Sequence, residues 1–403
     1  MSLVNGELLY GFASSGKVKV WKASTDFKLN DDGHIVITVE WGYETGKKQT
    51  KIRLVKSGKN KGKSNETTVE QQAQLELEYL YQAQIDSNYV YKDKLEELRA
   101  NPPKNAMLAH KYKDKVHTLP LDAEGNFTED VYAQPKLNGI RCESRKTDET
   151  NIDYISRTNK PFTNFPHLNK GCLDALEVKE SLDSELFNPA LLFEHIASMV
   201  NADTDRNIYE EDGTTVKHTV EDVHLYTYDL MGHDGLTFKE RYEILEEKAK
   251  NFPPEIVLVE TVKVRSLDHV KELFTKWRSE GYEGLMLRVG KGKYEYSKRS
   301  TNLLKYKEME QEEFRIVNIF PADNDPDKVM FTLWSEVGQA EFQCALKGDK
   351  QENLKYLKNK PEYLDQYLTV DYQALSKYNM PLFPVGIAVR KGTMVDGKFI
   401  PDV

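Results

Sequence analysis

The segment Ala133–Arg141, with the sequence AQPKLNGIR, constrains the fold more than any other stretch of this chain. Tyr132 and Ala133 are typical of the end of a β-strand, and Gly139 allows the backbone to come close to a bound group. Lys136, three residues before that glycine, can act as a nucleophilic amine in a phosphate pocket. Taken alone, the motif Lys136–Gly139 is too short to exclude a solvated lysine, because Lys136 is one of 56 basic residues in the chain.

Five further motifs follow in order and strengthen the signal. They are Ser156-Arg157-Thr158, Asp183-Ser184-Glu185-Leu186, Tyr226-Thr227-Tyr228-Asp229, EGLMLR at 283–288 and LLKYK at 303–307. Together with the first, they resemble the ordered motifs of the covalent nucleotidyltransferases, most closely the ATP-dependent DNA ligases of phages and large DNA viruses. Six matches in order over about 170 residues are a strong signal, and the resemblance covers roughly residues 105–403.

The resemblance implies an α+β multidomain fold. A chain of 403 residues is too long for one core of ordinary size. We expect a small α+β N-terminal module at 1–85, a linker at 86–104, a nucleotidyltransferase (adenylation) domain at 105–310 and an OB-fold barrel at 311–403. Strand patterns in the last part agree with a barrel: Phe314–Phe320, Val329–Trp334, Glu341–Ala345 and Val385–Arg390.

The N-terminal module has its own signals. Tyr10–Phe12, Val18–Trp21 and Ile35–Val39 are typical of strands, and Thr68 with Gln71 forms a capping box that predicts a helix. The order is distantly similar to WGR-type modules, which occur beside DNA-processing domains, although the tripeptide at 41–43 is Trp-Gly-Tyr.

A basic run follows the tripeptide. Eight lysines and arginines, and no acid, lie between Lys47 and Lys63. We predict that this run contacts DNA, since cations gain affinity by displacing counterions from phosphates; the residues chosen are Lys56, Lys59, Lys61 and Lys63. The alternative is a solvated β-hairpin. The net charge of −9 argues against a protein that coats nucleic acid indiscriminately.

The resemblance implies a three-step reaction. Lys136 would form a phosphoramidate with AMP and expel pyrophosphate, AMP would pass to the 5′-phosphate at a nick, and the 3′-hydroxyl would displace it. A free lysine has a pKa of about 10.4, so the attacking amine has to be activated. Lys305 and Lys307 are candidates for this, because they alternate with Tyr306 and neighbouring positive charge favours the neutral amine.

The resemblance also assigns the other site residues. Arg141 and Arg157 would contact the nucleotide and the nick 5′-phosphate, and Lys305 and Lys307 the α-phosphate. Glu185 would meet the ribose or a metal, Glu283 would bind the catalytic metal, and Tyr228 would stack on adenine. Read singly, Tyr228 fits a core aromatic and the carboxylates fit a solvated surface. The implied cofactors are ATP, as AMP donor, and Mg²⁺ or Mn²⁺; the implied partner is nicked double-stranded DNA.

Two positions depart from the family pattern. Asn138 stands where the family usually has aspartate, and an engineered replacement would look the same as a natural one. Arg390-Lys391-Gly392 occupies the place of the C-terminal basic motif that orients pyrophosphate, without its usual acid. Arg390 is therefore the candidate nucleotide-binding residue there.

Three rival functions stay open: an RNA ligase on the same scaffold, an mRNA guanylyltransferase using GTP, and a non-catalytic nick-binding protein. The cysteines Cys142, Cys172 and Cys344 form neither a disulfide framework nor a zinc pattern, which favours a reducing compartment. We expect the cytoplasm, or the host cytoplasm or nucleus for a viral protein. No membrane partner is expected, because no apolar run or secretory signal is present, and we expect a monomer.

Overall fold

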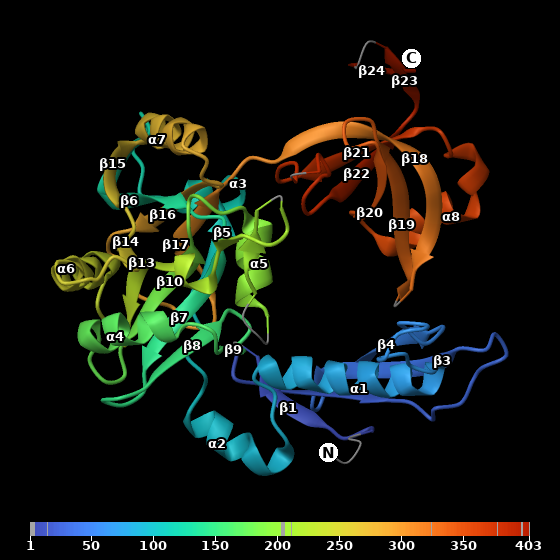
Figure 1. Cartoon of the computed structure of the whole chain (residues 1–403), viewed down its shortest axis with the longest axis horizontal. Coiled ribbons are helices and arrows are strands. Elements are labelled where there is room, and N and C mark those ends of the chain that lie inside the picture. Colours follow the sequence, from blue (N-terminus) through green and yellow to red (C-terminus); the bar gives the residue numbers. More distant parts are fainter. Residues whose placement is uncertain are drawn as a thin grey trace. The chain divides into compact units, whose positions relative to one another are not determined.

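The computed structural model describes residues 5–13, 15–202, 206–210, 212–323, 325–376, 378–395 and 398–402. The chain divides into two compact units, and Figure 1 labels their helices and strands. The central unit is the continuous segment Asn101–Lys307, and the outer unit combines the chain up to Ala100 with the chain from Glu308 onward. The four-part division expected from the sequence stays a prediction.

The N-terminal module is an antiparallel sheet with one long helix on it. The sheet order is β1 (Leu9–Phe12), β2 (Val18–Ser24), β3 (Ile35–Tyr43) and β4 (Lys48–Val55). Helix α1 (Val69–Asp86) begins at Thr68, and the predicted capping box with Gln71 is confirmed. Ala73 and Leu77 of α1 are buried against Trp21 of the sheet. Helix α2 (Leu95–Ala100) follows, and Pro102 and Pro103 come directly after it.

The central unit contains two large sheets. The six-stranded sheet has the order β14 (Ile256–Leu258), β13 (His224–Met231), β10 (Ser181–Phe187), β7 (Ile140–Lys146), β8 (Ile152–Ser156) and β9 (Pro161–Phe162). The five-stranded sheet has the order β15 (Val262–Ser266), β6 (Asn126–Lys136), β16 (Gly284–Val289), β17 (Arg299–Tyr306) and β5 (Leu108–Lys111). A small hairpin is formed by β11 (Ile208–Tyr209) and β12 (Val216–His218).

Helices cover one apolar face of each sheet. On the six-stranded sheet, the core includes residues of α4 (Pro166–Ala175), α5 (Phe193–Val200) and α6 (Phe238–Ala249). On the five-stranded sheet, α7 (Leu267–Ser279) packs on Leu285 and Leu287 of β16. Because side chains alternate along a strand, Met286 and Arg288 point to the other face, as Asp183 and Glu185 do on β10. The sequence thus leaves each sheet with one polar face for a site.

The expected OB-type barrel is confirmed. Its closed order is β18 (Glu310–Ala322), β19 (Asp325–Ser335), β20 (Ala340–Leu346), β22 (Val385–Arg390) and β21 (Tyr367–Tyr372). Sequence reasoning missed β21 and helix α8 (Lys350–Lys358), which Asp349 caps. A hairpin of β23 (Gly392–Val395) and β24 (Lys398–Pro401) ends the described chain. Among the described residues, no helix is both long and apolar enough to cross a membrane.

Candidate nucleotide site

Lys136 lies at the end of β6, where β16 brings Glu283 next to it. Gly284 is the register partner of Lys136, and the backbone N–H of Glu283 donates to the carbonyl of Lys136 at 2.9 Å. A Cβ at Gly284 would lie 2.3 Å from the carbonyl oxygen of Tyr306 on the next strand. Glycine therefore lets β16 and β17 approach closely enough to place both motifs beside Lys136.

The carboxylate of Glu283 binds two ammonium groups. Its Oε2 accepts from Lys136 and its Oε1 accepts from Lys307 at 2.7 Å. Burial alone would raise the pKa of Glu283, but Lys136 and Lys307 outweigh it and leave the pKa below its ordinary value. Burial lowers the pKa of Lys305, and the positive charges of Lys136 and Lys307 lower it further. The structure thus brings these four predicted residues together, while their roles stay predictions.

Glu185 on β10 borders the same place. A Cβ at Gly139 would lie 2.8 Å from Cγ of Glu185 and 2.3 Å from the carbonyl oxygen of Leu186, so glycine is required for the turn after Lys136 to lie against β10. Burial raises the pKa of Glu185 to about 7, in spite of the nearby Lys136 and Arg141. A carboxyl in this state is stabilised by a cation or a hydroxyl donor.

Glu185 and Glu283 are the carboxylates that border Lys136. Within the described ranges, no group of three or more His, Cys, Asp or Glu side chains could hold a metal ion. Glu185 and Glu283 are nevertheless close enough to interact electrostatically. Mg²⁺ is commonly held by one or two carboxylates together with substrate phosphates and water. The two glutamates fit a cation that is completed by nucleotide phosphates.

Arg141 is held in place by the protein. Its Nε and Nη2 donate to the two oxygens of Asp183 at 2.8 and 2.6 Å, and Nη1 donates to the carbonyl of Met107 at 2.7 Å. The hydroxyl of Tyr294 donates to Asp183 at 2.5 Å. Arg157, exposed in the turn after β8, lines a small pocket together with Arg141. The two arginines predicted to bind phosphate thus share one pocket.

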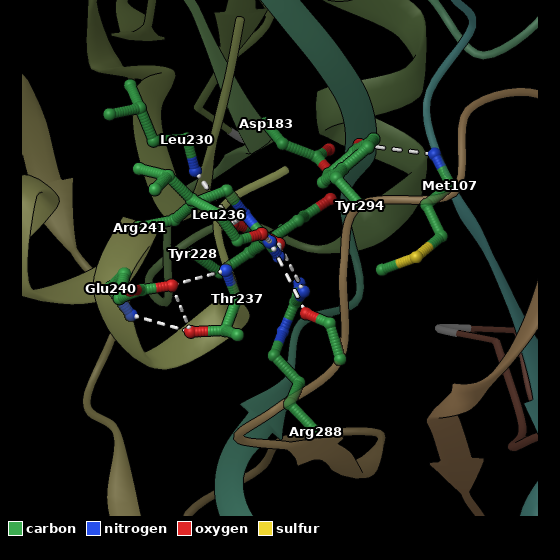
Figure 2. A network of polar contacts seen from close by, with 12 residues as sticks. Met107, Asp183, Tyr228, Leu230, Leu236, Thr237, Glu240, Arg241, Arg288 and Tyr294 are labelled. Carbon is green, nitrogen blue, oxygen red and sulfur yellow. Dashed lines mark hydrogen bonds and ion pairs between the residues drawn. The ribbon is translucent and has the colours of Figure 1, made fainter. Parts of the chain in front are cut away.

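A buried polar network joins the two sheets (Figure 2). Asp229 accepts from Arg241 at 2.8 and 3.0 Å and from Arg288 at 2.6 Å, and all three side chains are buried. Nε of Arg288 also donates to Gln134 at 2.7 Å, and Gln134 donates to the backbone carbonyl of Tyr228 at 3.0 Å. The network fixes β6, two residues before Lys136, to β13 and β16.

Tyr228 lies at the border of this network. Its ring centroid is 6.0 Å from the guanidinium carbon of Arg141 and 5.4 Å from that of Arg288. Its hydroxyl donates to the carbonyl of Ser184 at 3.2 Å, and burial raises its pKa, so the phenol stays neutral. These contacts hold the ring of Tyr228 in one orientation; its stacking on adenine stays a prediction.

The remaining predicted residues lie elsewhere. Arg390 is exposed at the end of β22 in the outer unit, where it pairs with Tyr367. The basic run is divided: its first half forms β4, and the four selected lysines are exposed in the loop before α1. Lys48 donates to the carbonyls of Tyr43, Glu44 and Gly46, so this lysine closes the β3–β4 turn.

Sequence reasoning gave no role to several residues that support the site. These are Gln134, Asp183, Asp229, Arg241, Arg288 and Tyr294. A signal was present for four of them, because Gln134, Asp183, Asp229 and Arg288 belong to the ordered motifs themselves. Arg241 and Tyr294 lie outside these motifs.

Comparisons with known proteins find related sequences among viral and phage DNA ligases. The DNA ligase of African swine fever virus (a Warthog isolate from Namibia) is 27% identical over 279 residues, covering 67% of this chain and 61% of the viral protein. The DNA ligase of Enterobacteria phage T4 is 26% identical over 171 residues, covering 39% and 35% of the two chains. The chain thus spans less than two thirds of the length of these relatives.

Solved structures share the fold. The structure named Pmar-Lig_Pre has a TM-score of 0.58 at 18% identity, covering 75% of this chain and 72% of that one. A structure from a study of Lig E DNA ligases has a TM-score of 0.55 at 20% identity, covering 72% of this chain and all of its own. Residues 106–307, which include Lys136, Glu185, Glu283 and Lys307, match the family described as "ATP dependent DNA ligase domain". The chain therefore belongs to the ATP-dependent DNA ligase domain family.

Proposed function

We propose that this protein is an ATP-dependent DNA ligase that seals nicks in duplex DNA through a lysyl-AMP intermediate. The observation that carries the proposal is the cluster of Lys136, Glu283, Lys305, Lys307 and Glu185, which lies inside the domain that matches the ligase family. A lone solvated lysine would not have a carboxylate and two further ammonium groups arranged around it.

In the first step, the neutral Nζ of Lys136 attacks the α-phosphorus of ATP. A phosphorus–nitrogen bond forms, the bond to the bridging oxygen breaks, and pyrophosphate leaves with that electron pair. The proton lost by the amine has an acceptor at hand, because Glu283 is already hydrogen-bonded to Lys136. Lys305 and Lys307 are placed to stabilise negative charge that develops on the α-phosphate.

A divalent cation, held by Glu283 and Glu185, would polarise the α-phosphate and compensate its charge. Glu185 would otherwise contact the ribose, where its raised pKa lets it serve as a hydrogen-bond donor or acceptor. Tyr228, held by its hydroxyl and its arginine neighbours, would present its ring to adenine.

In the second step, a 5′-phosphate oxygen at the nick attacks the phosphorus of lysyl-AMP. The phosphorus–nitrogen bond breaks, Lys136 recovers its amine, and a phosphoanhydride forms. In the third step, the 3′-hydroxyl attacks the 5′-phosphorus, the phosphodiester forms, and AMP leaves. Arg141 and Arg157 line one pocket, which supports their assignment to phosphate binding.

The outer unit would hold the DNA. The exposed lysines of the loop before α1 support contact of the N-terminal module with the phosphate backbone, and Arg390 would orient pyrophosphate in the first step. The free, buried cysteines Cys142, Cys172 and Cys344 support a reducing compartment such as the cytoplasm.

Intact-protein mass spectrometry after incubation with ATP and Mg²⁺ tests the proposal. We expect a mass increase of one AMP in the wild type and none in Lys136→Ala, together with joined product on a 5′-phosphorylated DNA nick. GTP in place of ATP separates a guanylyltransferase, and a matched RNA nick separates an RNA ligase. Binding to nicked DNA without any adduct would instead identify a non-catalytic nick-binding protein and overturn the proposal.

A further inference from the structure

Three aromatic rings lie in a stack behind the strand that carries Lys305 and Lys307. The ring of Tyr306 has its centroid 4.1 Å from that of Phe274, with 20° between the ring planes. On its other side, the centroid of Tyr112 is 4.5 Å away, with 19° between the planes. The three rings come from β17, from α7 and from α3 (Tyr112–Lys115), so the stack joins segments that are far apart in the sequence.

The stack lies on the opposite side of β17 from Lys305. Lys305 is the register partner of Met286, and Tyr306 is the partner of Leu285, which belongs to the buried core under α7. Tyr306 is packed against that same core. Because neighbouring side chains leave a strand on opposite faces, fixing the ring of Tyr306 also fixes the direction in which Lys305 leaves the backbone.

The stack also lies at the border of the central unit. Strand β17 ends at Tyr306, the central unit ends at Lys307, and Glu308 already belongs to the outer unit. Lys307 therefore directly adjoins the outer unit in the sequence, and Tyr306 separates it from Lys305. Tyr306, between those two lysines, is the last residue of the strand that a packed core can hold in place.

We propose that Tyr306, held between Phe274 and Tyr112, is a positioning residue that keeps Lys305 and Lys307 aligned with Glu283 and the α-phosphate. The inference rests on the proposed function. Tyr306 touches no reacting atom in this assignment; it acts through its two neighbours. A misplacement of about 1 Å at a reacting group can lower a rate about 100-fold, so a ring remote from the phosphate can have a large effect.

The experiment compares Tyr306→Leu with Tyr306→Phe in the full-length chain. Single-turnover formation of lysyl-AMP is measured over a range of ATP concentrations with Mg²⁺. We expect Tyr306→Phe, which keeps the ring, to retain a rate close to the wild type. Tyr306→Leu should lose about 30- to 100-fold in the rate at saturating ATP, with less than about a threefold change in the ATP concentration for half-maximal rate, because alignment and not binding is lost.

Two further variants separate positioning from folding. Tyr112→Leu removes one of the two rings that hold Tyr306. It should lower the rate at saturating ATP, but by less than Tyr306→Leu. Tyr154→Leu removes a ring from the separate core under the six-stranded sheet and serves as the control for lost packing. Urea unfolding of each variant measures its free energy of unfolding, so that a loss of rate caused by lost stability can be recognised.

The outcomes are distinct. A wild-type protein that forms no lysyl-AMP overturns the proposed function. A wild-type protein that forms it, with Tyr306→Leu and Tyr112→Leu losing no more rate than Tyr154→Leu, overturns only the positioning role. A Tyr306→Leu defect confined to the ATP concentration dependence, or a Tyr306→Phe variant as slow as Tyr306→Leu, overturns it as well.

Discussion

The carboxylate of Glu283 binds the ammonium group of Lys136 directly, so the candidate nucleophile is paired with the residue predicted to hold the metal. Lys307 shares the same carboxylate. An ammonium that donates to a carboxylate is in its charged, unreactive form. Lys136 therefore has to lose a proton before it attacks, and Glu283, which is in contact with it, is placed to accept that proton.

Replacement of Glu283 by Gln should lower the rate of lysyl-AMP formation by about 100-fold, because the amide frees Lys136 but removes a charged ligand for the cation. The rate should be measured at several Mg²⁺ concentrations. Glu272→Gln, on the exposed side of α7, is the control with the same charge change. A Glu283→Gln rate equal to that of the control would remove Glu283 from the chemistry.

Glu185 should make stability depend on pH. Its pKa of about 7 in the folded protein lies above the ordinary value of 4.5, so the folded state binds this proton more tightly than the unfolded state. The resulting stabilisation is complete below about pH 4.5 and is lost as the pH rises through about 7. Glu185→Gln, which cannot ionise, should reduce the loss of unfolding free energy between about pH 5 and 8 by roughly 1–3 kcal/mol.

Urea unfolding at several pH values measures this effect. The same Glu272→Gln variant should keep the pH dependence of the wild type. Parallel curves for the wild type and Glu185→Gln would mean that Glu185 ionises in the folded state as readily as in the unfolded state.

Asp229→Asn should destabilise the central unit. Asp229 compensates the buried guanidinium groups of Arg241 and Arg288, and removing one partner of a buried ion pair costs about 3–5 kcal/mol. The free energy of unfolding in urea is the measurement. Asp268→Asn breaks an exposed pair with Lys271 and should cost less than about 1 kcal/mol. Equal losses in the two variants would contradict a structural role for the buried network.

The lysine loop should contribute to DNA binding through charge. Replacing Lys56, Lys59, Lys61 and Lys63 by Gln should weaken binding to a nicked duplex and reduce the slope of log K against log salt by about 2–4 units, since each phosphate contact contributes about 0.9. The control removes four other exposed lysines, on helices of the central unit: Lys170, Lys239, Lys250 and Lys271. A slope that falls equally in both variants would show a general charge effect.

Asn138→Asp should speed the first step. An aspartate two residues after Lys136 can hold a cation or its water, which the isosteric amide does less well. We expect an increase of about tenfold in the rate of lysyl-AMP formation, because groups that orient a metal or its water typically contribute about 10- to 100-fold. The rate is measured by mass spectrometry of samples quenched at successive times, for the wild type and the variant. An unchanged rate would show that an aspartate at position 138 is not needed for the first step.

Local signals predicted much of the fold. The capping box at Thr68 is confirmed, because a cap depends on residues within one turn. The barrel strands with clear turn residues at their ends were also found. Strand β21 and helix α8 both lie between the predicted strands Glu341–Ala345 and Val385–Arg390, where no element was predicted.

The supporting network was beyond local reasoning. Arg141 and Asp183 are 42 residues apart in the sequence, and Asp229 and Arg288 are 59 apart. The residues next to each of them in the sequence therefore give no sign that the charged group is paired. The division of the basic run was likewise hidden, because Lys48 binds the backbone of its own turn and Arg53 pairs with Glu76 of α1. Such pairings follow from how the sheets and helices pack.

Gly139 limits what this loop can become. Since even a methyl group there would collide with β10, position 139 cannot contribute a side chain to nucleotide recognition. An effort to change the nucleotide donor by directed evolution would therefore leave this position fixed and vary side chains on the facing strands β10 and β13.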